Sequence, residues 1–111
     1  MQIQLQMKGR TLVAKLTGDL DHHSAKTVKD MLESAIVNQS AQNLVFDFSG
    51  LSFMDSSGIG VILGRYKFIH SMGGQVTIAS KNKTVNRLIA MSGIERLISV
   101  YDSVELAVNS V

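Results

Sequence analysis

The 111-residue sequence contains no cysteine and no long apolar run. Without cysteine the chain has no disulfide framework and no thiolate chemistry, which suits a cytosolic protein. The first ten residues, MQIQLQMKGR, lack the apolar core of a secretory signal peptide. The apolar runs are also far shorter than the roughly 20 residues that a membrane-spanning helix needs. We therefore expect a soluble, cytoplasmic protein with no membrane span.

Charged residues are also sparse and scattered. The formal net charge is +2, and the densest basic stretch is Lys81-Asn82-Lys83. Proteins that bind nucleic acid normally carry a dense positive surface, so the composition gives no support to direct DNA binding. Hydrophobic residues make up 45% of the chain and are spread along it, which indicates a folded globular protein. The length predicts a single domain over residues 1–111.

Apolar periodicity predicts five strands and four helices. The strands are expected at residues 3–7, 11–16, 44–48, 75–79 and 98–101. The helices are expected to begin near Ser24, after Gly58, near Asn82 and near Asp102. Strands separated by helices pair in parallel through right-handed crossovers, whereas the first two strands form an antiparallel hairpin. The sequence thus predicts an α/β fold with a mixed, mostly parallel sheet of about five strands and four packed helices.

The pattern also predicts finer details of these elements. Residues 17–21 are expected to leave the sheet, and Asp102 is expected to cap the last helix in a capping box with Glu105. The first helix is expected to bury Val28, Met31, Leu32, Ala35 and Ile36. The second is expected to bury a face at i, i+3, i+4, i+7 spacing, made of Ile59, Ile62, Leu63 and Tyr66.

A polar stretch, Asp55-Ser56-Ser57-Gly58, separates the central apolar strand from the second helix, and we call it the serine knot. In the simplest interpretation one serine caps the helix and the other is a small spacer. In the functional interpretation one serine carries a phosphate, because unpaired N–H groups and the helix dipole favour negative charge at a helix start. A phosphoryl group would add about −1.5 to −2 charges, which Asp55 would oppose. We expect it to change the surface without disrupting the fold.

The glycines that follow the serine knot do not match a nucleotide-binding motif. Gly58, Gly60 and Gly64 have the spacing G-x-G-x-x-x-G, which is one residue too long for the dinucleotide fingerprint. No Gly-Lys-Ser/Thr follows, so the Walker pattern fails too. We predict no cofactor-binding residues and interpret these glycines as sites of close packing or close partner approach.

Two patterns that suggest an enzyme are incomplete. Asp21-His22-His23 has the residue types of a metal or phosphoesterase site, but adjacent histidines at a strand end point in different directions. An exposed loop is the simpler interpretation. Around Ser57 the esterase pattern G-x-S-x-G is missing, because Asp55 stands two residues before it. We predict no catalytic and no metal-binding residues.

Three blocks of the sequence together resemble the STAS family. They occur in the family's order and spacing, and they are LTGDLDHH (16–23), LSFMDSSGIGVILGRYK (51–67) and MSGIERLI (91–98). The resemblance is strongest to the sporulation anti-sigma factor antagonists of that family. Two alternatives stay open: an antagonist of the general stress response, and a STAS module of a larger signalling assembly. The resemblance implies a STAS domain over residues 1–111.

This resemblance implies a partner-switching regulator rather than an enzyme. In the family, the unphosphorylated antagonist binds an anti-sigma factor that is also a serine kinase, and so releases a sigma factor. The kinase brings ATP and metal and phosphorylates the second serine of the knot, here Ser57; a serine phosphatase removes the phosphate. The partner-binding residues that this implies are Asp21, Met54, Asp55, Ser56, Ser57, Gly58, Ile59 and Gly60. We expect the loop at Asp21 to lie beside the serine knot, because both follow strands at one end of the sheet.

Overall fold

A computed structural model describes residues 1–111 as one five-stranded sheet with four α-helices around it. The strands are β1 (Gln2–Lys8), β2 (Thr11–Leu20), β3 (Asn43–Met54), β4 (Val76–Ala79) and β5 (Ser99–Tyr101). The helices are α1 (Ala25–Asn38), α2 (Ser56–Ser71), α3 (Lys83–Ser92) and α4 (Val104–Asn109), with a short 3-10 turn, η1 (Ile94–Arg96), after α3. No helix is both long enough and apolar enough to cross a membrane.

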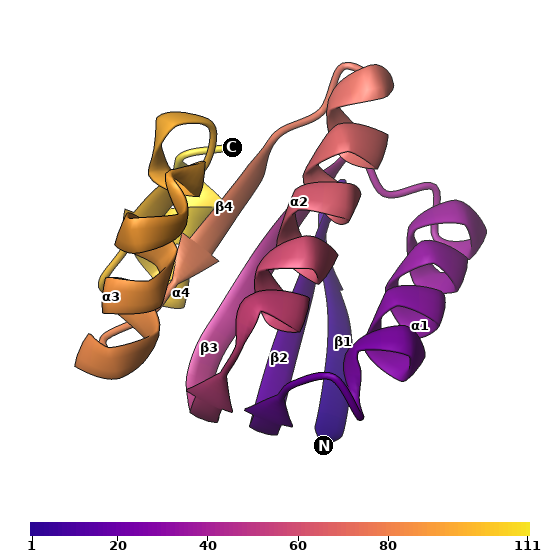
Figure 1. The fold of residues 1–111 in the computed structure, drawn as a ribbon. Coiled ribbons are helices and arrows are strands. Elements are labelled where there is room, and N and C mark those ends of the chain that lie inside the picture. Colours follow the sequence, from indigo (N-terminus) through magenta and orange to yellow (C-terminus); the bar gives the residue numbers. More distant parts are fainter.

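The strand order determines which face each helix covers. The sheet runs β1-β2-β3-β4-β5, with β1 antiparallel to β2 and every other pair parallel. Each parallel connection steps the same way along the sheet, so right-handed crossovers place α1, α2 and α3 on one face. Figure 1 shows these three helices in front of the strands, with α4 behind β4. The predicted mixed, mostly parallel α/β fold is confirmed.

The two faces of the sheet bury very different amounts of apolar surface. Side chains alternate across each strand, so Leu44, Phe46 and Phe48 face α1, α2 and α3 and belong to a main core of 22 buried residues. On the other face a cluster of only four buried residues joins the sheet to α4: Val13, Val45 and Ala79 lie on strands, and Ala107 lies on α4. The strand and helix on either side of the serine knot, β3 and α2, pack in the large core, whereas α4 packs in the small cluster.

Strands β2 and β3 are longer than the sequence predicted. Residues 17–20 stay in the sheet, and β3 continues past Phe48 to Met54. Two register shifts, between Lys15 and Thr17 and between Gly18 and Asp19, put extra residues on β3 and keep the pairing going. The expectation that residues 17–21 leave the sheet is therefore right only for Asp21 and wrong for residues 17–20, because irregular pairing hides the alternation by which a strand is recognised.

The buried faces of α1 and α2 also differ from the predictions. Met31 is 41% exposed, whereas Val28, Leu32 and Ile36 are buried as expected. On α2 the buried positions are Gly58, Val61, Ile62, Arg65 and Ile69, a face rotated from the predicted one. Because α2 is apolar nearly all round, its periodicity does not decide which side faces the sheet.

Side-chain caps fix where α3 and α4 begin. The amide oxygen of Asn82 accepts hydrogen bonds from the N–H groups of Thr84 and Val85, and Gly93 ends α3 in the left-handed conformation. The predicted start of this helix near Asn82 is confirmed. The cap of α4 is Ser103, which accepts from the N–H of Leu106, so the assignment of Asp102 was one residue early.

Candidate functional site

The serine knot and the Asp21 loop leave the sheet side by side. Strands β2 and β3 are parallel, and their last residues, Leu20 and Met54, are register partners. The next residues, Asp21 and Asp55, therefore start at the same edge. In Figure 1 this edge is at the bottom, where β2 and β3 end and α2 begins. The expectation that the Asp21 loop lies beside the serine knot is confirmed.

Asp55 ties the two segments together. Its Oδ1 accepts the N–H of Ser57 at 2.8 Å, which makes Asp55 the N-cap of α2. Its Oδ2 accepts the N–H of His22 from the neighbouring loop at 3.3 Å, and its own N–H donates to the carbonyl of Leu20. The expectation that a serine caps α2 is therefore wrong, and both serines lie in the first turn. Asp55 takes the cap because the helix begins two residues before the glycine that had been expected to mark its start.

Asp21 organises the second segment in the same way. Its Oδ1 accepts the N–H groups of His23 at 2.9 Å and Ser24 at 3.1 Å. Desolvation acts to raise the pKa of the Asp21 carboxyl, but these backbone hydrogen bonds together lower the pKa below its ordinary value. Asp21 is therefore ionised at neutral pH, and the Asp21-His22-His23 triplet is the start of an ordered loop. Ser24 precedes α1 but gives it no side-chain cap.

The eight predicted partner-binding residues divide into exposed and supporting groups. Ser56 and Gly60 are exposed, and Asp21, Asp55, Ser57 and Ile59 are partly exposed. Met54 and Gly58 are buried. A Cβ on Gly58 would collide with the Met54 side chain and would lie 3.0 Å from the carbonyl oxygen of Leu20. These two residues therefore let the first turn of α2 sit close against the sheet, and they support the surface from below.

The structure brings basic residues of α1 beside Ser57, which the sequence did not predict. A hollow of about 460 Å³ between α1 and α2 has Ser57 at one end, and Lys26 and Lys29 line it. Lys26 and Ser57 are 31 positions apart in the sequence. The one local sign of this polar helix interface was Arg65, a charged residue within the long apolar pattern of α2.

Comparison with known proteins identifies the family of this chain and agrees with its fold. The family model described as "STAS domain" matches residues 2–107. This chain belongs to the STAS family. It is 39% identical to an anti-sigma F factor antagonist of Paenibacillus polymyxa, over 93% of this chain and 88% of the relative. An antagonist of the same description from Lysinibacillus sphaericus is 34% identical over 85% of this chain and 81% of its own length.

A solved STAS structure agrees over nearly the whole chain. The Bacillus cell fate determinant SpoIIAA, in its phosphorylated form, matches with a TM-score of 0.76 and 30% identity, over 98% of each chain. The predicted resemblance to sporulation anti-sigma factor antagonists is thus confirmed. With its relatives, the STAS chain described here is an anti-sigma factor antagonist by similarity of sequence and fold.

Proposed function

We propose that this STAS domain is a cytoplasmic, phosphorylation-controlled antagonist of an anti-sigma factor that acts in sporulation. In its unmodified form it binds an anti-sigma factor with serine kinase activity and so frees the sigma factor. The kinase, supplying ATP and metal, phosphorylates Ser57 and ends the interaction, and a serine phosphatase restores it. The chain is a substrate and a switch in this scheme and has no catalytic role of its own.

The observation that carries the proposal is the position of Ser57 in the first turn of α2, where Asp55 caps the helix and also binds the adjoining Asp21 loop through His22. Asp55 holds the Ser57 backbone at 2.8 Å, and Asp21 shapes the adjoining loop. The relatives named above support the same role, since two are anti-sigma F factor antagonists and a third is a phosphorylated SpoIIAA.

A phosphoryl group at Ser57 changes the partner surface by charge more than by shape. It adds about −1.5 to −2 charges next to the carboxylate of Asp55 and in the neighbourhood of the Asp21 loop. A partner surface that accommodates a neutral hydroxyl and two carboxylates must then desolvate a larger negative charge. Because about 1.4 kcal/mol is a tenfold change in affinity, a modest electrostatic penalty is sufficient to reverse partner choice.

Binding of two Ser57 variants to the purified anti-sigma factor kinase tests this function. We expect Ser57→Ala to retain binding and to resist modification by kinase and ATP, and Ser57→Asp to bind at least about tenfold more weakly in calorimetric titration. Ser56→Ala is the matched control, since it removes the neighbouring hydroxyl and is expected to remain a substrate. Equal affinities for the Ala and Asp variants at position 57, or phosphate mapped by mass spectrometry to another residue, would contradict the proposal.

A further inference from the structure

The hollow beside Ser57 is open because two glycines of α2 face it. A Cβ added to Gly60 or Gly64 would meet no atom within 4 Å. These two glycines line the hollow of about 460 Å³ together with Ser57 at its end. A group attached to the Ser57 oxygen therefore has free volume along the α1–α2 boundary.

The charged side chains of this hollow come mainly from α1. Lys26 forms an ion pair with Asp30 at 2.7 Å, but the Lys26 side chain is 86% exposed and that of Asp30 is 52% exposed. An exposed pair of this kind contributes little to stability and exchanges partners readily. The Lys26 hydrogen bond lowers the pKa of Asp30, so Asp30 is ionised at neutral pH and competes for Lys26.

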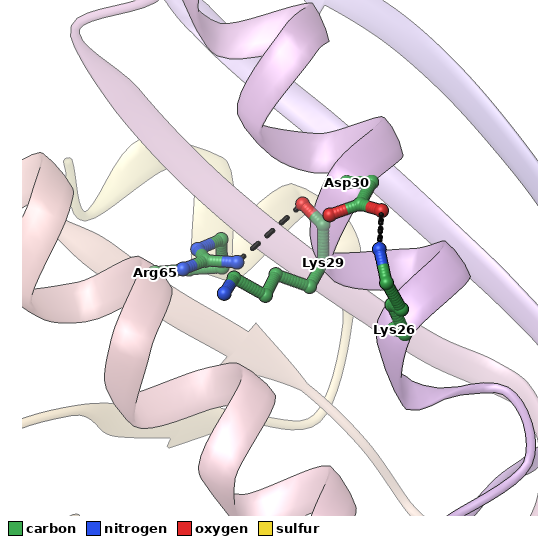
Figure 2. A network of polar contacts seen from close by, with 4 residues as sticks. All are labelled: Lys26, Lys29, Asp30 and Arg65. Carbon is green, nitrogen blue, oxygen red and sulfur yellow. Dashed lines mark hydrogen bonds and ion pairs between the residues drawn. The ribbon is translucent and has the colours of Figure 1, made fainter.

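Lys29 is a second cation of the hollow and is held in place through its backbone. The Arg65 guanidinium, from α2, donates to the Lys29 carbonyl at 3.4 Å and pairs with Glu33 at 3.0 Å. The chain's two ion pairs are Lys26–Asp30 and Arg65–Glu33, so the Lys29 ammonium has no carboxylate partner. Figure 2 shows the Lys29 side chain extending from α1 toward Arg65. Because Arg65 is only 5% exposed and is paired with Glu33, its guanidinium is held in place at this part of the hollow, and Lys29 supplies the uncompensated positive charge.

The start of α2 leaves few free donors to compensate a phosphate. The N–H of Ser57 is taken by the Asp55 carboxylate, and the N–H groups of Gly58 and Ile59 both donate to the Asp55 carbonyl. Asp55 also adds a negative charge next to the modified oxygen. A dianion on Ser57 must therefore find its counter-charges outside its own helix, and α1 offers the two lysines of the hollow.

We propose that Lys26 and Lys29 of α1 form a receiving site for the phosphoryl group of modified Ser57. The Lys26 ammonium leaves Asp30 and pairs with the phosphoryl oxygens. The Lys29 ammonium, from the next turn of α1, pairs with them as well. The site offsets part of the negative charge of the phosphate and so stabilises the phosphorylated form of the chain itself. The carboxylates of Asp55 and of Asp30, which Lys26 releases, keep the modified surface negative. This inference rests on the proposed function in one respect, that Ser57 is the modified residue.

The phosphate titration of a chain carrying phosphoserine at position 57 tests the receiving site. The phosphoserine is installed during protein synthesis, so the result does not depend on recognition by any kinase. Phosphorus NMR then follows its second ionisation, which is near pH 6 for an unperturbed phosphoserine. Neighbouring cations favour the dianion, so Lys26→Gln and Lys29→Gln should each raise this phosphate pKa, by about 0.2–0.7 of a unit per lysine.

Two further variants make the test specific. Asp30→Asn frees Lys26 and removes a competing carboxylate, so it should shift the phosphate pKa downward, opposite to Lys26→Gln. Lys67→Gln removes an exposed lysine of α2 that does not line the hollow, and it should leave the pKa within error of the parent. If the phosphate pKa of the Lys26 and Lys29 variants equals that of the Lys67 variant, the two lysines do not bind the phosphate and the proposed receiving site is wrong. The proposed function would then stand or fall separately on the kinase-binding experiment.

Discussion

At the scale of single residues, Asp55 connects the fold to the function of the site. One carboxylate caps α2 through Ser57 and holds the Asp21 loop through His22. The same charge would oppose the proposed phosphate on Ser57, so the residue that orders the site would also make that modification electrostatically costly. Such double use restricts this position to a side chain that is short, acidic and able to accept two hydrogen bonds.

The capping role of Asp55 gives a stability prediction. Asp55→Ala removes the acceptor for two backbone N–H groups, and we expect it to lower the free energy of unfolding by about 1–2 kcal/mol in urea denaturation. Ser56→Ala is the control, because Ser56 is exposed in the first turn and does not cap the helix. We expect that change to stay within about 0.5 kcal/mol of the parent protein. If Ser56→Ala lowered the free energy of unfolding more than Asp55→Ala, Ser56 rather than Asp55 would be the residue that caps α2.

At the scale of elements, two glycines of α2 have opposite surroundings. Gly58 faces the Met54 side chain and the Leu20 carbonyl, whereas Gly64 faces open space. We expect Gly58→Ala to destabilise the protein by about 1–3 kcal/mol, because the Leu20 backbone cannot move aside as a flexible side chain can. Gly64→Ala should stabilise it by about 0.5–1 kcal/mol, the usual gain from replacing glycine inside a helix.

Equilibrium unfolding of the two glycine variants shows whether close packing or helix propensity determines the effect of each substitution on stability. If both variants shift stability in the same direction and by the same amount, helix propensity alone governs them. In that case the close approach of α2 to the end of β2 does not contribute to stability. Opposite signs would show that Gly58 is required where the serine knot meets the sheet.

The elements of this chain differ in how far their own sequence determines them. Periodicity was sufficient for the order of strands and helices, because each one buries an apolar face large enough to leave a pattern. It failed at residues 17–20, where pairing with β3 continues through two register shifts that only the partner strand reveals. It also failed for the buried face of α2, since the orientation depends on where α1 and the sheet lie.

In the candidate site, too, some features follow from the local sequence and others depend on how the helices pack. That the Asp21 loop lies beside the serine knot was predictable, because both segments directly follow strand ends that are visible in the sequence. The lysines of the hollow were not predicted, because their closeness to Ser57 arises only when α1 packs against α2. Arg65 was visible as a charge in an apolar pattern, but its partners Lys29 and Glu33 lie on another helix.

At the scale of the whole molecule, the sheet has one strongly and one weakly covered face. The serine knot is anchored in the main core of 22 buried residues. By contrast, α4 has six residues, and its one buried residue, Ala107, packs on three buried sheet residues of the four-residue cluster. The Thr77 hydroxyl also donates to the Ala107 carbonyl at 3.0 Å. A helix this short does not persist without tertiary contacts. We infer that α4 opens at a lower free energy than the rest of the domain.

Hydrogen exchange on a matched pair of α4 variants tests whether α4 opens at a lower free energy than the rest of the domain. Ala107→Asp places a charge at a fully buried position, whereas Leu106→Asp places it on the same helix at a position that is 53% exposed. We expect Ala107→Asp to abolish protection of the α4 amides while β2 and β3 keep most of theirs, and Leu106→Asp to change little. Because the serine knot depends on the other face, binding to the anti-sigma factor should survive the detachment of α4. A uniform loss of protection through the sheet in Ala107→Asp would instead show that both faces unfold as a single cooperative unit.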